Sequence, residues 1–221
     1  MDVNHEDRSY CPTGVLESGR RFFGSNYDGC ISCFSTPLKA ASSQGNKAMV
    51  ELLLEAGADA NDADINGHTP LLEAATYGDK EVAEVLLNYG AEPNVADSEG
   101  FTPLYKAAGA FSTSMVQLLL ERGALVDGAS VNGWTPLRKA AFLGDRDVVK
   151  VLLDNGADPF KTFKKDDVLG RNCFSAAWMP EVKQMLIAAT VSRARNQIMI
   201  RQSNGARTQP YTIRVLHKRQ I

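Results

Sequence analysis

The sequence predicts an all-α solenoid of about five helix-turn-helix units, joined by β-hairpin-like loops and followed by a non-repeat tail. Three observations lead to this expectation. A Thr-Pro-Leu triplet begins at residues 36, 69, 102 and 135, so it recurs every 33 residues. A pair of small residues follows each triplet, and a leucine-rich stretch ending in glycine follows each pair. A constant period of this length is typical of repeat arrays.

The first helix of each unit is expected to begin at the triplet. Threonine caps a helix through its hydroxyl, and proline at the first helical position loses nothing because that N–H is unpaired anyway. The small pairs let neighbouring first helices approach closely. These pairs are Ala41 and Ser42, Ala74 and Ala75, Ala107 and Ala108, and Ala140 and Ala141.

The second helix of each unit is expected to bury a leucine stripe and to end at a glycine in the left-handed conformation. The leucine pairs are 53–54, 86–87, 119–120 and 152–153, and the glycines are Gly57, Gly90, Gly123 and Gly156. Segments rich in Asn, Asp and Gly then turn the chain back toward the next triplet.

These triplets, helices and glycines resemble the ankyrin repeat family over about residues 33–190. The resemblance implies a scaffold or assembly subunit that binds a partner protein through a concave groove and its hairpin tips. The chain departs from the family signature after each triplet, where Lys39, Leu72, Tyr105 and Arg138 replace histidine. This departure affects the hydrogen bonds that the histidine usually makes between units, and not the fold.

Three segments are predicted: an irregular N-terminal cap over 1–32, a repeat domain over 33–190 and a basic tail over 191–221. The units lie near 33–64, 65–97, 98–130 and 131–162, and a degenerate fifth unit over 163–190 forms the C-terminal cap. Terminal repeats are commonly atypical because their outer face meets water.

Composition is that of a folded soluble protein, with 44% hydrophobic and 23% charged residues. No stretch approaches the roughly 20 apolar residues that span a bilayer, and the polar first residues lack a signal-peptide core. The four cysteines suggest no disulfide framework, so they are expected to be reduced. We therefore expect an intracellular protein, cytoplasmic or nuclear.

No enzyme motif is present, and the chain has only three histidines. We therefore expect no catalytic site and no cofactor. Cys30 and Cys33 form a C-x-x-C pair that His5 or Cys11 would complete as four zinc ligands, but a second closely spaced pair is missing. The expected role of Cys30 and Cys33 is to pack the N-terminal cap without metal.

Large side chains recur at the predicted hairpin tips and helix ends. His68, Phe101 and Trp134 precede successive triplets and should form a ladder along one edge, because equal positions of stacked repeats line up. The expected partner-binding residues are His68, Tyr77, Phe101, Lys106, Trp134, Arg138, Phe142 and Leu143. The alternatives are that the tip rings lie on their neighbours and that the cations only solvate a face. Phe111 replaces a glycine and is expected to fill a local gap.

The tail is strongly basic. Eight of the 24 basic residues and no acidic residue follow Glu181. The rest of the chain therefore carries 16 basic and all 26 acidic residues. Its β-prone stretches flank a turn signal at Asn204 and Gly205, so an extended arm or hairpin is expected. The alternative function is binding of nucleic acid or a ribonucleoprotein; a third option is docking on the acidic body. The expected tail contacts are Arg193, Arg195, Arg201, Arg207, Tyr211, Arg214, Lys218 and Arg219.

Overall fold

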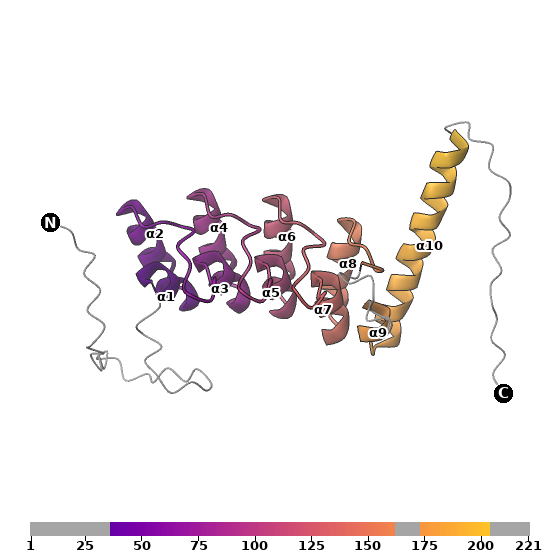
Figure 1. Ribbon diagram of the computed structural model, residues 1–221, viewed down its shortest axis with the longest axis horizontal. Coiled ribbons are helices and arrows are strands. Elements are labelled where there is room, and N and C mark those ends of the chain that lie inside the picture. The colour runs from indigo at the N-terminus through magenta and orange to yellow at the C-terminus, as the bar shows by residue number, and fades with distance from the viewer. Residues whose placement is uncertain (1–35, 162–172, 204–221) are drawn as a thin grey trace.

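The computed structural model describes residues 36–161 and 173–203, which contain helices and loops and no strand. Helices α1 to α8 form four helix pairs in a single row, and a fifth unit closes the row (Figure 1). The inner helices are α1 (Pro37–Ser43), α3 (Pro70–Tyr77), α5 (Pro103–Gly109), α7 (Pro136–Leu143) and the short α9 (Cys173–Ala176). The outer helices are α2 (Lys47–Glu55), α4 (Lys80–Asn88), α6 (Thr113–Glu121), α8 (Arg146–Asp154) and the long α10 (Pro180–Ser203). The predicted all-helical repeat fold is confirmed.

The threonine of each triplet caps its inner helix, as the sequence predicts. In all four caps the threonine hydroxyl accepts a backbone N–H three residues later, at 3.1 to 3.3 Å. Each proline is the first residue of its helix.

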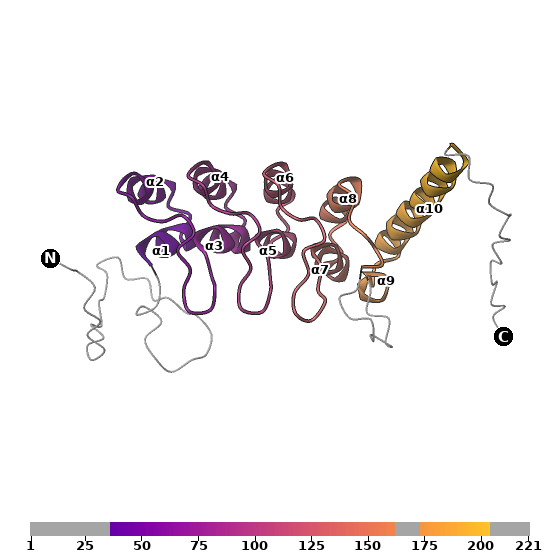
Figure 2. The ribbon, with the colours of Figure 1, turned by 45° about the horizontal axis from the view of Figure 1, so that its top comes forward.

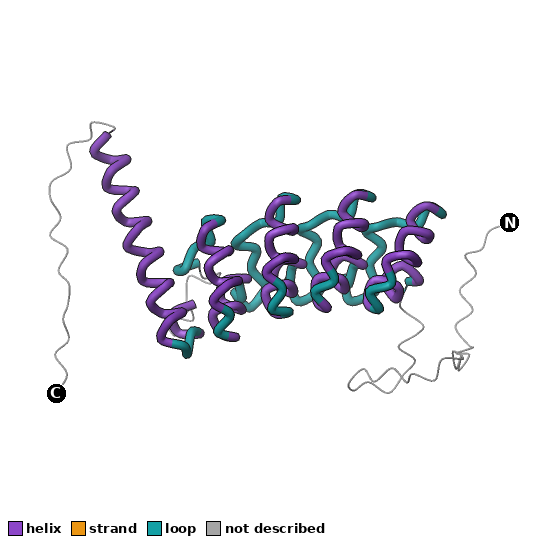
Figure 3. The backbone as a smooth tube through the Cα atoms, turned by 180° about the vertical axis from the view of Figure 1, so that it is seen from behind, coloured by secondary structure: helices purple, strands orange, loops and turns teal. Residues whose placement is uncertain are grey.

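The core runs along the row between the inner and outer layers. The alanine pairs of α3, α5 and α7 have no exposed surface, which lets these inner helices pack directly on one another. In the outer layer, Leu86, Leu119 and Leu152 are fully buried. The outer helices are followed by glycines with φ between 87° and 90°. Seen from behind, the row is continuous, with connecting loops between the helices of every unit (Figure 3).

Hairpin-like loops, here called fingers, project past the inner helices (Figure 2). Each finger closes by a backbone hydrogen bond, such as Asp97 N–H to the Phe101 carbonyl at 3.1 Å. Neighbouring fingers are also joined, because Ser98 N–H donates to the Asn66 carbonyl at 2.8 Å. The fingers therefore hold the inner-helix starts in a fixed register.

A side-chain amide fastens successive units to each other. Asn94 donates to the carbonyl of Gly123 at 3.1 Å and accepts from the N–H of Leu125 at 2.8 Å. Asn61 makes the same pair of bonds one unit earlier. The next equivalent residue is Asp127, which accepts from the Asp158 N–H but has no proton to donate.

Arg193 of α10 replaces the missing donor. It donates to the Gly156 carbonyl, the equivalent of Gly123, and its Nη1 lies 3.4 Å from Asp158 Oδ1. Val182 and Leu186 of the same helix are fully buried. These contacts anchor the first half of α10, and its second half extends away from the row (Figure 1).

The expectation of an extended or hairpin tail from residue 191 is wrong up to Ser203, because α10 continues through this boundary. Nothing between Pro180 and Gly205 breaks a helix, and Arg, Gln, Met and Ala are good helix formers. A helix started at Pro180 therefore continues through the β-prone stretch around residue 198. Arg201 lies in this helix. The expected tail contacts Arg207, Tyr211, Arg214, Lys218 and Arg219 lie outside the described residues, as does the predicted cap over 1–32.

Arg193→Ala is expected to loosen α10 from the last repeat. The variant loses one hydrogen bond and a partly exposed ion pair, so the stability cost is about 1 kcal/mol or less. Hydrogen exchange should quicken in α10 and not in α4. Arg195→Ala is the control, since Arg195 is exposed on the same helix. Equal protection of α10 in both variants would show that Arg193 does not hold the helix.

Candidate functional site

Two aspartates organise the fingers from equivalent positions. Asp64 Oδ1 accepts the backbone N–H groups of Asn66 and His68, both at 2.9 Å. Asp97 Oδ1 accepts the N–H of Phe101 at 2.8 Å in the same way. The second oxygen of each carboxylate is left to face cations from the inner helices.

Those cations are lysines of the inner helices α1 and α5. Lys39 pairs with Asp64, and Lys106 Nζ lies 3.0 Å from Asp97 Oδ2. Burial alone would raise the pKa of Asp64, but the Lys39 ammonium and two backbone N–H groups lower it below its usual value. Lys39 stands where the family signature has histidine, so an ion pair joins helix and finger there.

His68 lies among carboxylates of its own chain. Its Nδ1 is 3.5 Å from Glu73 Oε1, and its Nε2 is 3.7 Å from Asp97 Oδ2. His68 and Lys106, both expected to contact a partner, therefore already have partners within the first three units. Their contact with another protein remains a prediction.

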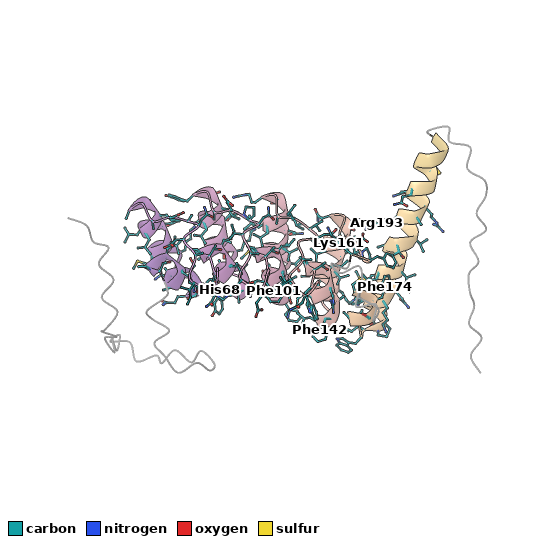
Figure 4. The ribbon with its side chains drawn as sticks, in the orientation of Figure 1. His68, Phe101, Phe142, Lys161, Phe174 and Arg193 are labelled. Carbon is teal, nitrogen blue, oxygen red and sulfur yellow. The ribbon has the colours of Figure 1, made fainter. Side chains whose placement is uncertain are left out.

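The third unit carries a stacked pair of aromatic rings. The Phe101 and Tyr105 rings stack at 4.3 Å, and Lys106 Nζ lies 5.0 Å above the Phe101 ring. Burial raises the pKa of Tyr105. The predicted ladder of tip rings is thus rearranged, because Phe101 stacks on Tyr105 of α5, the helix that begins two residues after it. His68, Phe101 and Phe142 follow one edge of the row (Figure 4).

Trp134 is half-buried and makes two contacts on α7. The Arg138 guanidinium lies 4.0 Å from the indole centroid, and Phe142 meets the indole edge-on at 5.8 Å. Arg138 also donates to the Gly133 carbonyl at 3.4 Å. The expectation that Arg138 is an open cation beside the tip is corrected, since only 9% of it is exposed. Arg138 and Phe142 are four residues apart on α7 and share a helix face, which lets both contact the indole of Trp134 just before the helix.

Trp178 extends this face into the fifth unit, and the sequence analysis missed it. Its indole Nε1 donates to the Phe142 carbonyl at 3.0 Å, while 67% of the residue remains exposed. A signal was present, because Trp178 follows Ala176 and Ala177 as Phe142 follows its own alanine pair. The equivalence of Trp178 and Phe142 is hard to see in the sequence, because the fifth unit lacks the Thr-Pro-Leu triplet.

Lys139 is the cation of this region with no carboxylate partner among the described residues. Its ammonium lies 5.7 Å from the Tyr105 ring centroid, so it reaches from α7 across to α5. We call the combined area the aromatic face, made of Phe101, Tyr105, Trp134, Lys139, Phe142 and Trp178. Of the other expected contacts, Tyr77 is exposed at the end of α3 and Leu143 is half-buried.

Cys173 is buried, its thiol donates to the Pro159 carbonyl at 2.8 Å, and burial raises its pKa to about 12. Over 36–161 and 173–203, no three His, Cys, Asp or Glu side chains are grouped as metal ligands. Cys30 and Cys33 lie outside the described residues. No helix of the described segments has the length and apolar character needed to cross a membrane.

Comparison with protein families agrees with this geometry. A family model described as three copies of the ankyrin repeat matches residues 16–97 and 86–162. The first match begins inside the segment assigned to the N-terminal cap. The chain matches none of the curated proteins with which it was compared.

Proposed function

Because this chain belongs to the ankyrin repeat family, whose repeats generally mediate interactions between proteins, we propose that it binds a partner protein through its aromatic face. The observation that carries the proposal is the exposure of Phe142 and Trp178, at 50% and 67%, beside a tryptophan fixed by its own arginine. Clustered exposed rings mark interaction sites on soluble proteins. The family is typically non-enzymatic, so the proposed role is that of a scaffold or assembly subunit.

The basic tail gives a second contact in this proposal, and nucleic-acid binding is the alternative. Arg193 gives little support to the nucleic-acid alternative, because its guanidinium already contacts the Gly156 carbonyl and the Asp158 carboxylate. Arg195 is exposed and open to either partner. Reduced cysteines, as the sequence predicts, support a place inside the cell, in the cytoplasm or nucleus.

The double variant Phe142→Ala with Trp178→Ala is expected to lose the partner. Both rings are half-exposed or more, so their removal should cost little stability, whereas aromatic hot spots are typically worth 2 kcal/mol or more in binding. The measurement is quantitative affinity purification with the wild-type chain and each variant, followed by mass spectrometry.

Two further variants make this comparison decisive. Leu125→Ala removes an apolar residue of similar exposure, 63%, from the loop after α6 and should keep the partner. Replacing Arg207, Arg214, Lys218 and Arg219 by alanine tests the tail. If only this tail variant loses its ligand, and the ligand is RNA or DNA, the nucleic-acid alternative replaces the proposal.

A further inference from the structure

Phe111 has a backbone conformation that the other units give to glycine. Gly45, Gly78 and Gly144 occupy the equivalent turn between inner and outer helix with φ of 66°, 76° and 78°. Phe111 has φ of 57° and is the one non-glycine residue with positive φ in the described ranges. For a residue with a bulky side chain, this region costs roughly 1–2 kcal/mol.

Phe111 is not part of the hydrophobic core. The expectation that it fills a local gap is wrong, since 59% of the residue is exposed. The ring contacts found within 36–161 and 173–203 do not include it. The strained backbone of Phe111 thus lowers the stability of the isolated chain, and its exposed ring does not offset this cost by burial in the core. Backbone strain of this kind clusters at functional sites.

Phe111 completes a row of exposed rings across four units. Tyr77 ends α3, Phe142 lies near the end of α7, and Trp178 follows α9, with exposed fractions of 61%, 50% and 67%. The inner helices of these units pack side by side. Packed helices lie about 8–10 Å apart, so the row spans about 25–30 Å. Each of the second to fifth units contributes one ring.

An unpaired cation lies within the same region. A Cβ atom at Gly109 would be 3.0 Å from Lys139 Cε, so the glycine leaves room for this lysine to cross the end of α5, two residues before Phe111. No described carboxylate forms an ion pair with Lys139. The region therefore combines open aromatic rings with the ammonium of Lys139, which has no carboxylate partner among the described residues.

We propose that Phe111 is a partner-binding residue and that it acts with Tyr77, Phe142 and Trp178 to hold an acidic segment of a partner protein that presents apolar side chains. This inference rests on the proposed function and deepens it. The apolar side chains match the row of rings, and a carboxylate matches Lys139. A single-stranded nucleic acid fits less well, because it needs several free cations. Here Lys106 is paired with Asp97, and Arg138 is buried against Trp134.

The test begins with a displayed library of random peptides about 16 residues long, from which binders are selected on the full-length chain. At about 3.3 Å per residue, an extended peptide of this length is longer than the row of rings. The enriched peptides should combine Asp or Glu with aromatic or aliphatic residues. Phe111→Gly should weaken binding of a selected peptide about tenfold or more, measured by fluorescence anisotropy. The same variant should melt about 2–8 °C higher, because removing roughly 1–2 kcal/mol of strain raises the melting temperature by about 2–4 °C per kcal/mol. Leu125→Ala should change neither value.

Each other outcome overturns the inference. If Phe142→Ala with Trp178→Ala abolishes peptide binding but Phe111→Gly does not, the role of Phe111 falls and the proposed function stands. A lower melting temperature for Phe111→Gly would show that the ring serves stability. If no peptide is enriched, the proposed function fails as well. Binding of oligouridine that depends on Phe111 would replace the protein partner by nucleic acid.

Discussion

Leu119→Ala is expected to lower the free energy of unfolding by about 2–5 kcal/mol. Leu119 is fully buried in α6, which packs between α4 and α8. In a repeat array each unit contacts only its neighbours, so a cavity in a central unit weakens two interfaces at once. The measurement is urea denaturation followed by circular dichroism.

Leu125→Ala is the matched control for this variant, since the same atoms are removed from a residue that is 63% exposed. Its effect should stay within about 0.5 kcal/mol. Similar losses in the two leucine variants would mean that α6 does not lie in the continuous core described above.

Asp97→Ala is expected to cost about 2–3 kcal/mol, because it leaves two part-buried backbone N–H groups and the Lys106 ammonium without their acceptor. The carboxylate accepts the N–H groups of Glu99 and Phe101 at 3.1 and 2.8 Å and pairs with Lys106 at 3.0 Å. The finger that positions Phe101 would therefore lose its internal support. Urea denaturation gives the stability, and backbone amide shifts of residues 97–101 report on the finger.

Asp97→Asn and Asp97→Ser separate the two roles of this side chain. Asparagine keeps an oxygen acceptor for the backbone and loses the charge. Serine reproduces the next finger, where Ser130 Oγ accepts the Trp134 N–H at 3.2 Å. Both variants should be less destabilised than Asp97→Ala. If Asp97→Asn is as unstable as Asp97→Ala, the charge rather than the finger turn accounts for the loss.

The repeat units could be predicted from sequence because their boundaries depend on local chemistry. The capping threonine, the proline and the closing glycine act within a few residues, and all recur with the same period. The course of α10 could not be predicted in this way. Its β-prone side chains favour a strand locally, but burial of Val182 and Leu186 fixes a helix that has no reason to stop before Gly205.

The candidate site was predicted only in part. Positions before the triplets do carry large rings, yet the sequence does not show which neighbour each ring chooses. Phe101 stacks on Tyr105, and Trp134 lies under Arg138. These contacts depend on rotamers and on which side chains of the inner helix face the ring that precedes it. The exposure of Phe111 could not be predicted either. An aromatic residue at a glycine position can fill a local gap or leave its ring open to solvent, and the sequence is the same in both cases.

Arg193 supplies a guanidinium at the C-terminal end of the array, where the earlier units use the side-chain amide of an asparagine. The two ends of the array should therefore respond differently to ionic strength. The neutral bonds of Asn61 and Asn94 are insensitive to dissolved ions, whereas the contact of Arg193 with Asp158 is half-exposed and subject to screening. Added salt should therefore weaken the attachment of α10 at Arg193, while buried Val182 and Leu186 keep the start of this helix packed and the preceding junctions stay closed.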